Sequence, residues 1–152
     1  MPESEKHAIN DSESADPDPL PDLGVVNLHY TFFCNYKCTF CHSHFFDSRT
    51  GDKISLERWQ RIIELLRPYC KRINFAGGEP LFHKKEVGEL IKATDAAGLI
   101  ATIITNGVYM TRDWIDSYGP FLKAIGISCD SALEETQKQL KRGNGRHVAE
   151  SL

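Results

Sequence analysis

Three cysteines within eight residues are the side chains of this sequence best suited to chemistry. Cys34, Cys38 and Cys41 form a C-x3-C-x2-C cluster directly after an apolar, β-branched stretch. Thiolates hold iron–sulfur clusters, and a cubane usually takes four of them. Three thiolates at this spacing can bind three irons of a [4Fe–4S] cluster and leave the fourth iron open. Because a structural metal is normally closed on all sides, the pattern favours a catalytic centre.

Spacing alone leaves two alternatives to an iron–sulfur cluster. A structural zinc ion would take the three thiolates and either His42 or His44, as in a Cys3His site. The three cysteines would otherwise be structural residues that lie close together by chance, which is the less favoured interpretation. Cys70 and Cys129 follow a predicted helix and a predicted strand, and we interpret both as small buried residues rather than ligands.

A glycine-rich turn, Gly77-Gly78-Glu79-Pro80, directly follows the next predicted strand. Glycines at the end of a strand let the backbone approach a ligand without a Cβ atom in between. We expect the amide hydrogens of these glycines to face the carboxylate or amine of a bound amino acid. Glu79 would then accept a hydrogen bond from an ammonium group. Alone, this tetrapeptide is more often a plain turn, so its meaning depends on the cysteines about 36 residues before it.

The elements that must position these motifs alternate between strands and helices. Apolar and β-branched stretches predict strands at residues 25–32, 72–76, 99–104 and 122–128. Apolar positions at helical spacing predict helices at residues 54–69, 84–97, 111–118 and 131–141. Ser55 is the expected N-cap of the first helix, and Ser131 and Glu134 form a capping box that opens the last one. This alternation through short loops is typical of parallel βαβ units in an α/β fold.

Together and in this order, the two motifs resemble the radical S-adenosylmethionine (SAM) superfamily. The resemblance implies a [4Fe–4S] cluster on the three clustered cysteines, with SAM bound at the open iron. It also implies that SAM is held by an aromatic residue before the last cysteine, by the glycine-rich turn and by residues that close two strands: Phe40, Gly77, Gly78, Glu79, Asn106 and Ser128. Ligands of parallel barrels lie at the carboxyl ends of strands, where Asn106 and Ser128 are expected. An equally favoured interpretation is that Asn106 and Ser128 are ordinary turn residues with no ligand.

Radical SAM domains are similar to partial (β/α)6 barrels, and this chain is expected to be the N-terminal portion of one. About four βα units are visible in the sequence, so roughly two strands of such a barrel are missing. We expect residues 25–152 to form this incomplete radical SAM domain, as part of something longer. Residues 1–24 hold seven acids, one lysine and four prolines, which is typical of a disordered acidic tail.

A narrower resemblance, to the viperin family of antiviral nucleotide dehydratases, follows from longer motifs. These are Asn27, C-N-Y-K-C-T-F-C at residues 34–41, I-N-F-A-G-G-E-P at 73–80, I-S-C-D-S at 127–131, R-G-N-G at 142–145 and His147. The resemblance implies reductive cleavage of SAM and then dehydration of a nucleoside triphosphate, CTP, GTP or UTP. The product would be a 3′-deoxy-3′,4′-didehydro nucleotide, a chain terminator. A radical SAM enzyme acting on another substrate is the alternative.

The same resemblance implies which residues bind the nucleotide. Asn27, Arg72 and Arg142 fall on triphosphate-contacting positions, and arginine forks pair well with phosphate oxygens. No side chain is assigned a catalytic role, because the cluster and SAM carry the hard chemistry. A flavodoxin or ferredoxin is the expected electron donor. Arg72 and Ala76 replace a lysine and a serine of the animal family members, which bears on phosphate contacts and base preference.

Charge and hydropathy exclude several classes of protein. Residues 25–152 carry 17 basic and 14 acidic side chains, an excess too small to argue for direct binding to nucleic acid. No apolar run of 18 residues, signal peptide or amphipathic membrane helix is present, so we expect no membrane association. Five cysteines, three of them clustered, fit a reducing compartment, and the expected location is the cytoplasm.

Overall fold

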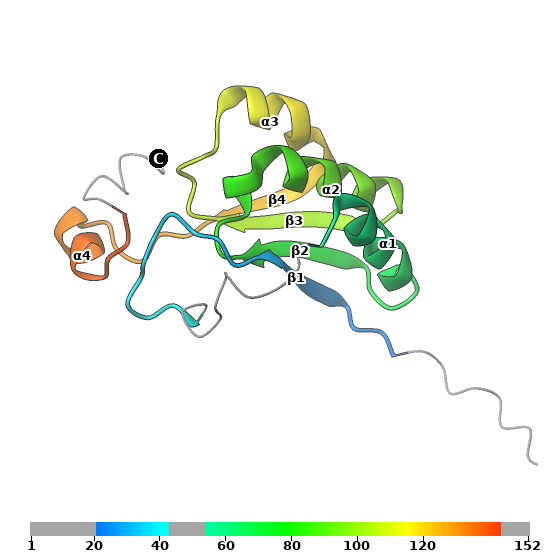
Figure 1. Cartoon of the computed structure of the whole chain (residues 1–152), viewed down its shortest axis with the longest axis horizontal. Helices are drawn as coiled ribbons and strands as arrows, with labels where there is room; N and C mark the ends of the chain where they lie inside the picture. The colour runs from blue at the N-terminus through cyan, green and yellow to red at the C-terminus, as the bar shows by residue number, and fades with distance from the viewer. Residues whose placement is uncertain (1–20, 43–53, 144–152) are drawn as a thin grey trace, which may run out of the picture.

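The computed structural model describes residues 21–42 and 54–143, in which four parallel strands form one sheet. The strands lie in the order β1-β2-β3-β4 (Figure 1). They are β1 (Val25–Thr31), β2 (Arg72–Gly77), β3 (Ile100–Thr105) and β4 (Leu122–Ile127). All four predicted strands are confirmed, and their bounds differ from the predicted ones by one residue at most at each end.

Helices connect the strands and cover one face of the sheet. The long ones are α1 (Leu56–Leu66) and α2 (Lys84–Ala96), and the short ones are α3 (Arg112–Tyr118) and α4 (Glu134–Gln139). Two 3-10 turns, η2 (Pro80–His83) and η3 (Gly119–Phe121), complete the connections. Figure 1 shows α1, α2 and α3 on the same side of the sheet, and α4 beyond the carboxyl ends of the strands. This arrangement confirms the predicted α/β class with parallel βαβ units.

The hydrophobic core fills the space between the sheet and the helices. Alternate residues of the strands point to this face, so Ile73 and Phe75 of β2 are fully buried in the core while Asn74 between them points to the other face. Helix α2 contributes Val87, Leu90 and Ile91. Each such side chain contributes about 1.5–3 kcal/mol by leaving water, and together they fix the strands that bear the motifs.

Local hydrogen bonds set the helix starts, and one of them differs from the prediction. The Ser55 hydroxyl accepts a hydrogen bond from the Arg58 amide at 3.3 Å, which confirms the predicted N-cap of α1. The capping box predicted for Ser131 and Glu134 is wrong. Ser131 Oγ instead accepts from the Leu133 amide at 3.0 Å, and α4 begins at Glu134 without a side-chain cap. A serine that bonds two residues ahead forms a local turn that competes with the helix.

The acidic tail falls mostly outside the described residues, which begin at Pro21. Its last part is attached to the domain: the Leu23 amide donates to the Tyr69 carbonyl at 2.7 Å, and Asp22 pairs with Lys71 at 3.4 Å. In residues 21–42 and 54–143, no helix is both long and apolar enough to cross a membrane.

Candidate functional site

The glycine-rich turn lies directly against the segment that leads into the cysteines. The Gly78 amide donates to the Thr31 carbonyl at 2.8 Å, and the Glu79 amide donates to the Phe33 carbonyl at 2.7 Å. A Cβ atom on Gly77 would collide with the Thr31 carbonyl oxygen, and one on Gly78 would collide with that of Phe33. The expectation that the glycine amides face a ligand is therefore wrong for Gly78. The glycines instead permit close contact between two backbone segments.

Glu79 is buried, and its carboxylate joins the ends of two strands. Oε1 accepts hydrogen bonds from the Leu81 amide at 2.9 Å and the Thr105 hydroxyl at 2.5 Å, and Oε2 accepts from the Asn106 amide at 2.8 Å. Burial raises the pKa of this carboxyl, and the three hydrogen bonds oppose the shift. Both oxygens are thus engaged within the protein, so a contact between Glu79 and a ligand ammonium stays a prediction.

Asn106 and Ser128 lie at the carboxyl edge of the sheet, as predicted from their places after strands. The Asn106 side chain donates to Asn35 Oδ1 at 2.8 Å and accepts from the Val108 amide at 3.1 Å. The Ser128 amide donates to the Thr105 carbonyl at 2.8 Å. Asn35 stands between two of the clustered cysteines, so its contact with Asn106 ties the cysteine loop to the end of β3.

The three clustered cysteines occupy one loop after β1. Cys38 is buried, and Cys34 and Cys41 are half-buried. The Tyr36 amide donates to Cys34 Sγ at 3.4 Å. Burial raises the pKa of both the Cys34 and the Cys38 thiol, and the charges of the neighbouring cysteines add to the shift. For Cys38 the nearby Arg142 guanidinium acts in the opposite direction.

Arg142 is buried beside the cysteine loop rather than exposed at a helix end. Its Nη1 lies 2.8 Å from Asp130 Oδ2 and 3.8 Å from Cys38 Sγ, and its guanidinium lies 5.9 Å from the ring centre of Phe40. The Thr39 amide also donates to the Leu140 carbonyl at 3.0 Å. Together these contacts fasten the end of α4 to the cysteine loop.

The structure does not bring the three predicted substrate residues together. Asn27 in β1 and Arg72 at the start of β2 lie on the face of the sheet opposite the core. Their neighbours Leu28 and Ile73 are buried in the core, and successive residues of a strand point to opposite faces. Arg142 follows α4, beyond the carboxyl ends of the strands. Whether these residues contact a nucleotide stays a prediction.

Comparison with known proteins places the chain in a family. The sequence profile of the Radical SAM superfamily matches residues 28–152. The chain belongs to the radical SAM superfamily. This confirms the resemblance to that superfamily, which was predicted from the cysteine cluster and the glycine-rich turn.

Relatives of this radical SAM chain include enzymes from animals and bacteria. It is 36% identical over 133 residues to the S-adenosylmethionine-dependent nucleotide dehydratase RSAD2 of Danio rerio, covering 84% of this chain and 36% of that protein. It is also 36% identical over 115 residues to the S-adenosylmethionine-dependent nucleotide dehydratase of Selenomonas ruminantium, covering 73% of this chain and 40% of that protein. The chain thus spans well under half the length of these relatives. These sequence identities confirm the predicted resemblance to viperin-like nucleotide dehydratases.

A solved structure supports the fold. Streptococcus suis SuiB bound to S-adenosylmethionine superposes with a TM-score of 0.70, 18% identity, and coverage of 85% of this chain and 30% of that one. At this identity the likeness concerns the fold alone. The predicted N-terminal portion of a radical SAM barrel is therefore confirmed.

The donor set of this radical SAM chain fits an iron–sulfur cluster. An amide donates to Cys34 and a guanidinium lies beside Cys38, and donors to the sulfurs are what proteins use to tune such clusters. Among the described residues, no group of three or more His, Cys, Asp or Glu side chains is arranged to hold a single metal ion. Of the histidines considered as zinc ligands, His42 is exposed and His44 lies outside the described residues.

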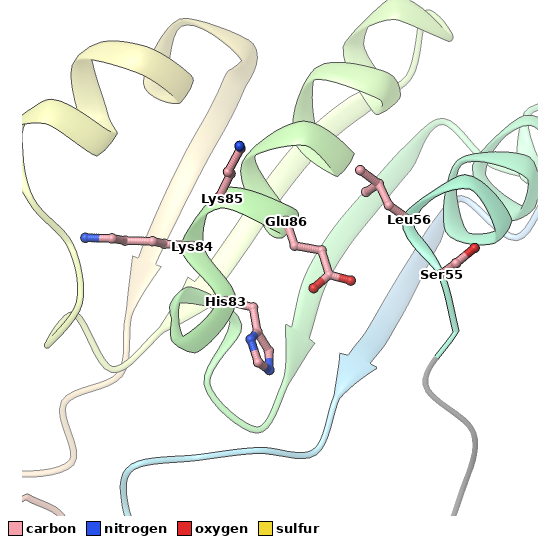
Figure 2. A pocket seen from close by; sticks show the side chains of 6 residues that line it. All are labelled: Ser55, Leu56, His83, Lys84, Lys85 and Glu86. Carbon is pink, nitrogen blue, oxygen red and sulfur yellow. The ribbon is translucent and has the colours of Figure 1, made fainter.

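A separate pocket of about 690 Å³ lies on the helical side of the sheet. It is formed where α1 and α2 begin, by Ser55, Leu56, His83, Lys84, Lys85 and Glu86. Figure 2 shows Glu86 extending toward the gap between the two helices and Lys84 extending away from it. None of the residues predicted to bind the cluster, SAM or the nucleotide lines this pocket.

Sequence reasoning missed several residues that build the site. Asn35, Thr105 and Asp130 each make a side-chain hydrogen bond or ion pair that positions a motif residue. Asn35 and Asp130 stand inside the motifs at residues 34–41 and 127–131, and Thr105 directly precedes Asn106, but no role was predicted for any of the three. Cys129 was wrongly expected to be buried: it is exposed, in the segment between β4 and α4.

The close approach at Gly78 generates the first prediction. Gly78→Ala should lower the free energy of unfolding by about 1–3 kcal/mol, because the new methyl group meets backbone atoms that have no room to move. Gly126→Ala is the matched control, since its Cβ would make only an ordinary contact of 3.4 Å. Chemical denaturation of both variants measures the difference. Equal midpoints would contradict the assignment.

The buried carboxylate generates the second prediction. Glu79→Gln should lower the free energy of unfolding by about 2–3 kcal/mol, because the amide NH2 would face a backbone donor, Leu81 or Asn106. Glu89→Gln on α2 is the control, since that carboxylate is partly exposed and pairs at the surface with Tyr118 at 3.2 Å and Lys92 at 3.5 Å. Urea titration monitored by circular dichroism compares them. A loss no greater than that of the control would refute the role of Glu79.

The ion pair beside the cysteines generates the third prediction. Asp130→Asn should free the end of α4 from the cysteine loop and speed the alkylation of Cys38 in the metal-free chain several-fold. The stability loss should be modest, about 1–2 kcal/mol, because Asp130 is partly exposed. Mass spectrometry after timed iodoacetamide treatment measures the rate, with Asp113→Asn as the control. Unchanged protection of Cys38 would show that the pair does not hold the loop.

Proposed function

We propose that this chain carries the cluster- and SAM-binding part of a nucleotide dehydratase. The reaction would convert a nucleoside triphosphate, CTP, GTP or UTP, to its 3′-deoxy-3′,4′-didehydro form, an antiviral chain terminator. A hydrogen atom leaves ribose C4′, the 3′-hydroxyl leaves as water with one added proton, and one added electron completes the product. A [4Fe–4S] cluster with SAM at its open iron would supply the 5′-deoxyadenosyl radical that removes the hydrogen atom.

The observation that carries this proposal is the joining of two motifs at one sheet edge. In a radical SAM chain, the loop with Cys34, Cys38 and Cys41 is fastened by backbone hydrogen bonds to the Gly77–Glu79 turn. Both lie where ligands of parallel barrels bind. The names of the relatives add the substrate class, since they are nucleotide dehydratases from fish and bacteria.

Each predicted SAM residue has a place in this proposal. Phe40 is 55% exposed, so its ring has a face available for the adenine of SAM. Gly77 and Gly78 keep the turn close to the cysteine loop, and Glu79 holds the turn against Asn106. Ser128 lies at the end of the neighbouring strand, where its side chain would approach the ribose or methionine part.

The remaining parts of the proposal concern the substrate and its surroundings. Asn27 and Arg72 would meet the triphosphate on the sheet face opposite the core, and Arg142 would approach it from the end of α4. A cytoplasmic flavodoxin or ferredoxin would deliver the electrons. The substrate would be the free nucleotide, with no direct binding to nucleic acid or membranes, since residues 25–152 carry only a small basic excess.

The fourth prediction tests this function directly. The chain is reconstituted anaerobically with iron and sulfide, then given dithionite, SAM and one of CTP, GTP or UTP. One triphosphate should raise the yield of 5′-deoxyadenosine and give a didehydro nucleotide, both read by chromatography. Cys38→Ser should lose both products by more than 100-fold, whereas Cys129→Ser, at an exposed cysteine outside the cluster, should keep them.

Other outcomes point to the alternatives. SAM cleavage that no triphosphate stimulates would indicate a radical SAM enzyme acting on another substrate. Zinc bound without iron or sulfide would indicate a non-enzymatic Cys3His module and would overturn the proposal.

A further inference from the structure

A row of hydrogen-bonded polar side chains crosses the sheet on the face opposite the core. Thr102 Oγ1 donates to Asn74 Oδ1 at 2.9 Å, and Asn74 Nδ2 donates to Asn27 Oδ1 at 2.8 Å. The strand register aligns the same residues, because Asn27 is paired with Asn74 and Asn74 with Thr102. The row therefore runs straight across β3, β2 and β1.

This polar row departs from what a parallel sheet ordinarily requires. Central strands of parallel sheets are usually apolar on both faces. Asn74 lies in such a strand between the fully buried Ile73 and Phe75, and is itself only 9% exposed. A buried amide is tolerated when hydrogen-bonded, but an aliphatic side chain would serve stability as well or better. A local rule broken in this way is expected mainly at functional sites.

The direction of the hydrogen bonds along the row determines how the Asn27 amide is oriented at its β1 end. A threonine hydroxyl donates to the Asn74 oxygen, so the Asn74 NH2 group is turned toward β1. Asn27 must then present its oxygen to Asn74, and its own NH2 group is turned outward. Asn27 is exposed, and the row thereby fixes the orientation of two hydrogen-bond donors. On the other side, Thr102 is paired with Ala124, which has no polar side chain to continue the row.

We infer that Asn74 and Thr102 are positioning residues that orient the Asn27 amide toward an oxygen of the nucleotide triphosphate. This inference rests on the proposed function and deepens it. Donors that are already ordered bind an anionic acceptor without the loss of side-chain freedom that an unrestrained asparagine would suffer. The row thus sets how well the substrate binds, while the cluster and SAM lie at the carboxyl edge of the same sheet.

The fifth prediction compares two substitutions at one position. Thr102→Val keeps the side-chain shape but removes the donor, and should raise KM for the triphosphate about 3- to 10-fold with little change in kcat. Thr102→Ser keeps the hydroxyl and should behave like the parent chain. Cleavage of SAM without nucleotide should be the same in all three, because the hydrogen bonds of the row join Thr102, Asn74 and Asn27 to one another and, within the described residues, none of them reaches the cysteine loop or the glycine-rich turn.

A double-mutant cycle separates positioning from general stabilisation. Asn27→Ala should raise KM by at least as much as Thr102→Val, and adding Thr102→Val to Asn27→Ala should change KM no further. Thermal unfolding of every variant is measured alongside. Equal KM for Thr102→Val and the parent, or an effect of Thr102→Val that persists undiminished in Asn27→Ala, would overturn the inference.

The two proposals fail in different experiments. If no triphosphate stimulates the parent chain, the nucleotide function is wrong and the inference falls with it. If the parent responds to a triphosphate but the cycle is additive, only the positioning role of Thr102 and Asn74 is wrong.

Discussion

The buried carboxylate of Glu79 is the constraint on which the rest of the site depends. A carboxylate removed from water must be compensated by hydrogen bonds, and three donors from two elements surround this one. They come from the start of η2 and from the end of β3, so the charge holds together two strand ends that the backbone ladder alone would leave free. The glycines before Glu79 then bring a third segment, the start of the cysteine loop, into backbone contact. The C-terminal ends of β1, β2 and β3 are thus held close to the Glu79 side chain.

Two buried side chains of opposite charge act on different cysteines of the loop. The negative charge of Glu79 contributes to the raised pKa of Cys34, whereas the positive charge of Arg142 opposes the shift at Cys38. The two thiols therefore lie in different local potentials, although they belong to one loop. In a cluster with one open iron, such asymmetry would make the liganded irons inequivalent, because charge and hydrogen bonds near the sulfurs set their properties.

The sequence was sufficient to predict the order of strands and helices. Each strand is a short apolar and β-branched stretch, and each helix has apolar residues at helical spacing between turn residues. The first N-cap, Ser55, is likewise a local feature. What could not be predicted depends on contacts between distant residues. The amides of the glycine-rich turn bind carbonyl groups 46 or 47 residues earlier in the chain, and Arg142 meets Cys38 across 104 residues. The failed capping box at Ser131 shows a limit at short range, because the serine had two possible backbone donors and the residue pattern does not say which of them it bonds.

Strand β2 shows how one short segment serves both stability and recognition. Ile73 and Phe75 point into the core and account for the burial that keeps the sheet together, while Arg72 and Asn74 point to the opposite face. Because successive side chains point to opposite faces, the polar residues can change without loss of core packing. The requirement is that Asn74 keeps its hydrogen bonds, since it is nearly as buried as its apolar neighbours. That requirement explains why the polar row spans three strands: a single asparagine at this depth would leave an amide unsatisfied, whereas a row ending at the exposed Asn27 carries the unused donors out to solvent and to any ligand there.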